Sequence, residues 1–134
     1  MSVAILLITH GRLGQDLIDT AAQMLGRLSL RTEVLEVSSS HDPERLTLEA
    51  ASRLQALEQG DGVLVLTDAY GSTPSNIAVA AARGSAHQVV AGVNLPMLVR
   101  VYNYPDRSLP ETARIALEGG QRGVVLYQES GGHA

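Results

Sequence analysis

The chain has 134 residues, of which 45% are hydrophobic and 18% are charged, so it is long enough for one compact domain and too apolar to be disordered throughout. It contains no cysteine, which excludes disulfides, thiolate metal ligands and a cysteine nucleophile. The formal net charge of −4 argues against nucleic acid as a partner, and the ten basic residues are all arginine, which excludes mechanisms that need a lysine.

The N-terminal segment predicts a buried strand. Residues 3–9 are almost continuously apolar, as in strands that are covered on both faces, and the run stops at His10-Gly11. It has no basic flank and is too short for a signal peptide or a membrane span. We therefore expect a cytoplasmic protein without membrane insertion.

Further strands and helices alternate along the rest of the chain. Apolar runs predict strands at residues 32–37, 62–67, 88–93 and 123–127. Apolar spacing and start signals such as Asp42-Pro43 predict helices at residues 14–28, 43–60 and 74–84, a short helix after Pro96, and a last helix over 109–118 that ends before Gly119-Gly120. This order predicts an α/β fold with a mainly parallel sheet, in one domain over residues 1–128 followed by a flexible tail at 129–134.

The chemistry is expected where strands end, because open parallel sheets place ligand sites at the carboxyl ends of their strands. His10 follows the first strand and Asp68 follows the third. Each residue alone is compatible with a simple turn. Together they predict a catalytic pair, because a carboxylate that accepts from one imidazole nitrogen makes the other nitrogen a better nucleophile.

The segment Gly71-Ser72-Thr73-Pro74 predicts the N-terminus of a helix, where free backbone N–H groups favour a phosphoryl group. Simple capping by Ser72 or Thr73 would use the same end of the helix. Arg12 is a candidate for a phosphate or partner contact, with an ordinary solvated side chain as the alternative. The other three histidines have no ligand-like spacing, so we expect no metal site.

Three loops together resemble one family, the IIA component of the mannose class of the bacterial sugar phosphotransferase system. The matching motifs are Thr9-His10-Gly11, Asp68-x-x-Gly71-x-Thr73-Pro74-x-Asn76 and Gly92-x-Asn94-Leu95-Pro96-Met97-Leu98. The resemblance covers residues 1–128. It departs from the family at Ser72, where a second glycine is usual.

The resemblance implies a doubly wound sheet with helices on both faces and a last antiparallel strand, residues 123–127, that is shared across a homodimer. It also implies that the phosphocarrier protein HPr phosphorylates His10, that Asp68 orients the imidazole, and that a histidine of a IIB domain takes the phosphoryl group. We expect no cofactor or metal.

Other residues around His10 are expected to bind the phosphoryl oxygens or to contact the partner proteins. Backbone N–H groups and hydroxyls of a helix start would bind the oxygens, and exposed side chains would form the rim of a shallow site. The candidates for phosphate binding are Gly71, Ser72, Thr73 and Ser75, and those for partner contact are Arg12, Leu13 and Tyr70.

Two other interpretations use the same site. In one, the phosphorylation state of His10 controls the binding of a regulated partner, without sugar transport. In the other, the chain resembles the phosphotransfer subunit of dihydroxyacetone kinase, which shares this domain type but usually carries further domains.

Overall fold

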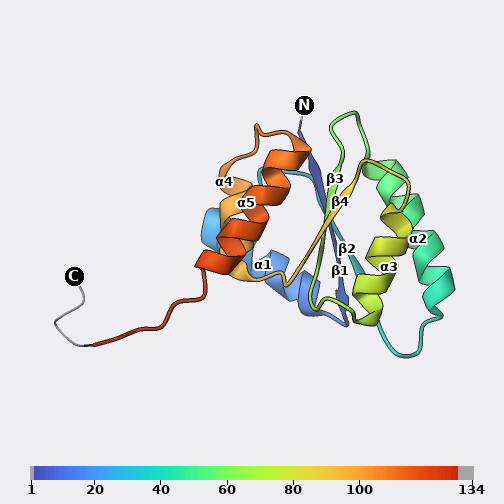
Figure 1. The fold of residues 1–134 in the computed structure, drawn as a ribbon, viewed down its shortest axis with the longest axis horizontal. Helices are drawn as coiled ribbons and strands as arrows, with labels where there is room; N and C mark the ends of the chain where they lie inside the picture. Colours follow the sequence, from blue (N-terminus) through green and yellow to red (C-terminus); the bar gives the residue numbers. More distant parts are fainter. Residues whose placement is uncertain (1, 130–134) are drawn as a thin grey trace.

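A four-stranded parallel sheet with helices on both faces forms the body of the protein (Figure 1). The structure, a computed structural model, describes residues 2–129. The strands lie in the order β2-β1-β3-β4, and every neighbouring pair is parallel. Their bounds are β1 Ala4–His10, β2 Thr32–Val37, β3 Val63–Thr67 and β4 Gln88–Ala91. The expected doubly wound α/β fold is confirmed.

The five helices divide between the two faces of this sheet (Figure 1). Their bounds are α1 Leu13–Leu25, α2 Pro43–Leu57, α3 Thr73–Ala82, α4 Leu95–Asn103 and α5 Leu109–Arg122. Side chains alternate along each strand, so Ile5 and Leu7 of β1 face α1, α4 and α5, whereas Leu6 and Ile8 face α2 and α3. The sheet therefore separates two hydrophobic cores.

Local start signals explain where the helices begin. The Asp42 side chain accepts a hydrogen bond from the Glu44 N–H, with Pro43 as the first residue of α2. Ser108 and Glu111 form a reciprocal capping box at α5. These caps fix the helix starts within one residue of the positions expected from the sequence.

The end of α5 differs from the expectation that this helix stops before Gly119-Gly120. It continues to Arg122 because the two glycines lie against α4. A Cβ atom at Gly119 would lie 2.7 Å from Cγ of Arg100, and one at Gly120 would lie 2.8 Å from Cε of Met97. The glycines therefore permit close packing between α4 and α5 instead of ending the helix.

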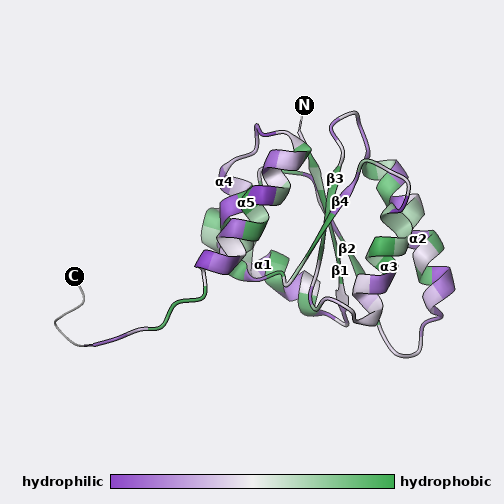
Figure 2. Ribbon diagram, viewed as in Figure 1, coloured by the Kyte–Doolittle hydropathy of each residue, from purple (hydrophilic) through white to green (hydrophobic). Residues whose placement is uncertain are grey.

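Residues 124–129, which follow α5 and the turn at Gly123, do not form a strand within the single chain. They extend away from the body of the protein (Figure 1), and their apolar character is visible in Figure 2. Val124, Val125, Leu126 and Tyr127 are 78–81% exposed. The strand expected at 123–127 would pair across a homodimer, so this pairing stays a prediction. Of the flexible tail expected at 129–134, residues 130–134 lie outside the described part of the chain. Within residues 2–129, no helix is long and apolar enough to cross a membrane.

Candidate functional site

The site lies where the order of the strands reverses. The chain passes from β1 to β2 on one side and then to β3 on the other, so the carboxyl ends of β1 and β3 flank the switch point. The register pairs Ile8 with Thr67. His10 at the end of β1 and Asp68 directly after β3 are thereby brought together, as the sequence predicts.

One oxygen of Asp68 holds both the backbone and the ring of His10. Asp68 Oδ2 accepts a hydrogen bond from the His10 backbone N–H at 3.0 Å and lies 2.7 Å from His10 Nδ1. An ionised carboxylate can only accept, so Nδ1 is the protonated ring nitrogen and Nε2 carries the lone pair. The His10 side chain is 57% exposed and that of Asp68 is 9% exposed, so Nε2 belongs to an open imidazole whose partner is largely covered.

The environment keeps Asp68 ionised. Burial raises its pKa, but hydrogen bonds from the backbone N–H and the ring of His10 lower it, as do a backbone N–H in its own loop and the charge of the His10 ring. The balance places the pKa of this carboxyl below its ordinary value of 3.8. The aspartate is therefore a permanent acceptor for the imidazole near neutral pH.

A tight turn carries His10 into α1. Gly11 adopts a φ of +48°, which favours glycine, and its N–H donates to the Val37 carbonyl at 2.8 Å. Arg12 lies 3.7 Å from a carboxylate oxygen of Asp16 and also 3.7 Å from one of Glu36. The turn is thus tied to the neighbouring strand β2 as well as to Asp68.

The residues expected to contact partners are exposed on the two loops beside His10. Arg12 and Leu13 lie at the start of α1, and Leu13 is 44% exposed. Tyr70 lies in the loop between β3 and α3 and is 86% exposed. An exposed leucine and tyrosine beside an open imidazole give a surface suited to another protein.

The expected phosphate-binding residues fall into two groups. Gly71 and Ser72 hold the loop together: the Gly71 N–H donates to Ser75 Oγ at 3.2 Å, and the Ser72 hydroxyl donates to the Ala69 carbonyl at 2.6 Å. By contrast, the backbone N–H groups of Thr73 and Ser75 find no acceptor among residues 2–129. The first turn of α3 therefore has two N–H groups without an acceptor in the described residues at the positive end of the helix, one on the exposed Thr73 and one on the buried Ser75.

Two polar residues beside the site, Thr9 and Asn94, have roles that the sequence motifs alone do not specify. Thr9 is fully buried, and its Oγ1 accepts a hydrogen bond from the Gly14 N–H at 2.7 Å. Asn94 caps α4 through the Met97 N–H and donates to the Gly120 carbonyl at 3.2 Å. A polar residue at the end of an otherwise apolar strand was the available signal for Thr9, and the Asn-x-Pro sequence was the signal for Asn94.

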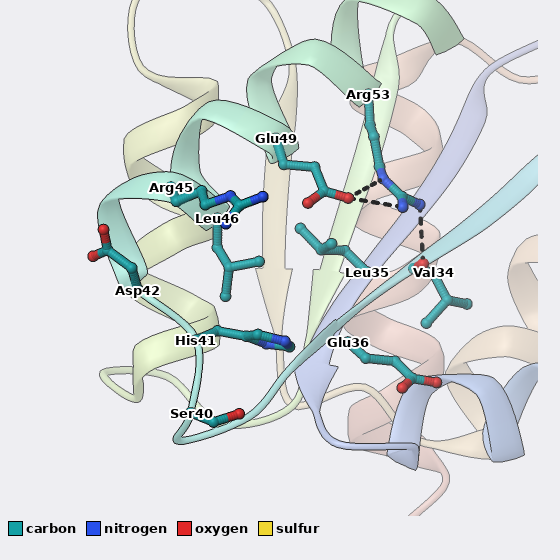
Figure 3. Close-up of a pocket in the computed structure, with 10 residues that line it drawn as sticks. All are labelled: Val34, Leu35, Glu36, Ser40, His41, Asp42, Arg45, Leu46, Glu49 and Arg53. Carbon is teal, nitrogen blue, oxygen red and sulfur yellow. Dashed lines mark hydrogen bonds and ion pairs between the residues drawn. The ribbon is translucent and has the colours of Figure 1, made fainter.

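A groove of about 660 Å³ opens between β2 and α2, and none of the residues expected in the site lines it (Figure 3). Its wall includes Arg53, which donates to the Val34 carbonyl at 3.1 Å on the outer edge of β2 and pairs with Glu49 at 2.9 Å (Figure 3). Arg53 thus forms a hydrogen bond with one of the carbonyl groups that point outward from this edge strand.

Comparisons with known proteins agree on one family. The family EIIA-man, described as PTS system fructose IIA component, matches residues 4–113. The chain is 33% identical over 127 residues to the PTS system mannose-specific EIIAB component of Escherichia coli K12, a match that covers 92% of this chain. It spans only 39% of the length of that relative.

Solved structures show the same fold. The mannose/sorbose specific IIA subunit of the phosphotransferase system from Enterococcus faecalis superposes with a TM-score of 0.85 at 25% identity, covering 97% of this chain and 98% of the other. The PTS IIA protein associated with the fucose utilization operon from Streptococcus pneumoniae gives a TM-score of 0.76 at 22% identity, covering 94% and 96%. The second likeness concerns the fold alone.

Proposed function

The chain belongs to the EIIA-man family of IIA components of the sugar phosphotransferase system, and from that premise we propose that it carries a phosphoryl group on Nε2 of His10. The observation that carries this proposal is the contact of 2.7 Å between His10 Nδ1 and Asp68 Oδ2, which leaves Nε2 as the available nucleophile. HPr is the proposed donor, and a histidine of a IIB component is the proposed acceptor. We also propose that this relay takes place in the cytoplasm.

The transfer needs only the two imidazoles and the N–H groups that donate hydrogen bonds to the phosphoryl oxygens. The lone pair of His10 Nε2 attacks the phosphorus in line, a new N–P bond forms, and the N–P bond to the donor histidine breaks with its electron pair returning to the donor ring. Nδ1 of His10 keeps its proton and its hydrogen bond to Asp68 Oδ2. Asp68 thereby stabilises the positive charge that develops on the attacking ring. Transfer to the acceptor histidine reverses these steps.

The start of α3 supplies donors for the equatorial oxygens. The N–H groups of Thr73 and Ser75 have no acceptor among residues 2–129, that of Thr73 belongs to an exposed residue, and the helix dipole adds partial positive charge. Gly71 and Ser72 contribute by fixing the loop that leads from Asp68 into this turn. Phosphate binding by these four residues is a prediction of the proposal.

The open surface around His10 is the proposed docking site for donor and acceptor. Two proteins must bring their histidines within bonding distance of the same nitrogen, so the imidazole must lie at the surface. Leu13 and Tyr70 provide apolar contact area, and Arg12 provides charge at the rim. Successive partners can then use one surface in turn.

We also propose that two copies of the chain assemble through their C-terminal segments. Val124–Tyr127 expose four consecutive apolar side chains, and β4 is an edge strand of the sheet. A groove of about 460 Å³ between β4 and α5 is lined by residues such as Val90, Ala113 and Leu117, the last of which is 44% exposed. A partner's segment that is paired with β4 would cover this groove.

The decisive experiment is phosphorylation by a reconstituted donor relay. The protein is incubated with phosphoenolpyruvate, enzyme I and HPr, and its intact mass and the acid lability of any adduct are measured. We expect one acid-labile phosphoryl group on the wild type, none on His10→Ala, and one on His41→Ala, which removes another exposed histidine from the same edge of the sheet. Full labelling of His10→Ala, or an unlabelled wild type beside active HPr, would overturn the proposal.

A further inference from the structure

We propose that Thr9 is a positioning residue of the phosphoryl site, acting through the turn that carries His10. The inference rests on the proposed function of His10. Thr9 does not touch the reacting atoms. Its buried hydroxyl determines where the following residue presents its backbone N–H and its ring to Asp68.

A buried hydrogen bond connects Thr9 at the end of β1 to the start of α1. Thr9 Oγ1 accepts from the Gly14 N–H at 2.7 Å, and the Thr9 side chain is 0% exposed. A Cβ atom at Gly14 would lie only 2.6 Å from this oxygen, so the helix approaches the end of β1 as closely as a glycine allows. The hydrogen bond is therefore short, buried and shielded from water.

The second step is that α1 has no other side-chain cap. Arg12 occupies the N-cap position, and its side chain makes no cap hydrogen bond. The hydroxyl of Thr9, from the preceding strand, takes over this role for the second residue of the helix. Removal of the hydroxyl leaves a buried N–H without an acceptor, and the start of α1 must move to satisfy it.

The third step connects this contact to the ring of His10. Residues 10–13 form a turn held at its strand end by the bond from the Gly11 N–H to Val37 and at its helix end by the bond from Gly14 to Thr9. Asp68 Oδ2 accepts from both the backbone N–H and Nδ1 of His10, so both bonds depend on how the main chain and ring of His10 are oriented. A shift at the helix end of the turn changes this orientation and weakens the preference for a proton on Nδ1.

The test measures the ring tautomer and the transfer rate separately. Nitrogen-15 NMR of the histidines at alkaline pH reports which ring nitrogen of His10 carries the proton, and rapid-quench kinetics with phosphorylated HPr reports the rate. We expect the wild type to hold its proton mainly on Nδ1. Thr9→Val should populate the other tautomer and slow phosphorylation about tenfold, and Thr9→Ser, which keeps the hydroxyl, should restore both readouts.

A matched control separates positioning from stability. Thr112 is 2% exposed, and its hydroxyl donates to the Ser108 carbonyl at 2.8 Å in α5. Thr112→Val should lower the free energy of unfolding without changing the His10 tautomer or the rate. If Thr9→Val does not fold, Thr9→Ala removes the same acceptor without placing a methyl group against the Gly14 N–H, and both measurements are made on it.

Two results would overturn the inference: a wild-type tautomer and rate in the folded Thr9 variant, or equal changes in Thr112→Val. The tautomer measurement needs no phosphoryl donor. A wild type that HPr cannot phosphorylate would therefore refute the proposed function, whereas an unchanged tautomer in Thr9→Val would refute the role of Thr9 alone.

Discussion

Asp68 is the residue on which the geometry of the site depends, because its Oδ2 atom takes hydrogen bonds from the main chain and the ring of the same histidine. Without this acceptor, either ring nitrogen of His10 can carry the proton, and the ring is free to rotate. Nε2 would remain present but would be a poorer and less well-directed nucleophile. The aspartate should therefore affect the rate of transfer more than its final extent.

Asp68→Ala is expected to slow phosphorylation of His10 by roughly 10–1000-fold while leaving the final stoichiometry at one. Rapid-quench kinetics with phosphorylated HPr measures this rate. Asp42→Ala is the matched control, because Asp42 also accepts a backbone N–H at the carboxyl edge of the sheet but caps α2 instead of contacting the imidazole. Equal rates for wild type and Asp68→Ala would show that Asp68 stabilises the turn but does not contribute to phosphoryl transfer.

The lowered pKa of Asp68 also predicts how its contribution to stability depends on pH. A carboxyl whose pKa is lower in the folded than in the unfolded state stabilises the fold above the unfolded value and loses this effect as the pH falls through the folded value. The difference in unfolding free energy between wild type and Asp68→Asn should therefore be fully present above pH 3.8 and shrink below it. Urea unfolding over a pH series measures it; a difference that grows on acidification would contradict the assignment.

At the scale of elements, the sequence predicts the two central strands β1 and β3 well because they are buried on both faces and read as continuous apolar runs. β1, β2 and β3 begin and end within one residue of the expected positions, and α2 begins at the expected Asp42-Pro43 signal. The predicted end of α5 before Gly119-Gly120 is too early, because glycine is a common helix terminator in sequence-based prediction. The contact of these glycines with α4 depends on tertiary packing that no local sequence pattern contains.

The same distinction explains what the sequence says about the site. His10 and Asp68 could be placed together because parallel strands bring their carboxyl ends to one edge. Thr9 stands out in the sequence only as a polar residue at the end of an apolar strand, and this pattern does not reveal which N–H group its hydroxyl accepts from. The bonds of Gly71 to Ser75 and of Ser72 to Ala69 depend on the conformation of one loop, so the sequence predicts a helix start there but not which amides stay available.

Arg53 gives a prediction about the edge of β2. Its guanidinium donates to the outward carbonyl of Val34 and pairs with Glu49 (Figure 3). It also lies 3.6 Å from a carboxylate oxygen of Glu33. Arg53→Ala should expose this edge and increase self-association, because unpaired edge strands pair with other chains. Light scattering over a concentration series measures the effect, with Arg45→Ala, from the same groove, as the control. Arg53→Ala with an unchanged size distribution would show that the edge needs no such protection.

At the scale of the whole molecule, the two edges of the sheet are not equivalent. Arg53 covers part of the β2 edge, whereas β4 borders a groove with exposed apolar side chains. The chain also carries a separate exposed apolar segment of its own, Val124–Tyr127. The β4 edge is thus the one suited to receive the segment of a second copy.

Truncation after Arg122 should convert a dimer into a monomer with its four-stranded sheet intact. Residues 123–129, the described part of the segment removed, belong neither to the sheet nor to either core, so the loss should concern assembly alone. Sedimentation equilibrium measures the mass, and truncation after Gln128 is the control that keeps the apolar segment. A monomeric full-length protein, or a dimeric chain ending at Arg122, would contradict the proposed assembly.

The separation of the two cores by the sheet has a consequence for how such a protein can change over evolutionary time. The core against α2 and α3 and the core against α1, α4 and α5 share the strands but not their side chains. Substitutions in one core can therefore accumulate and compensate one another without requiring changes in the other core. His10 and Asp68 are attached to strand ends whose alignment depends on backbone register, so lineages can diverge widely in both interiors while the proposed reactive pair keeps its geometry.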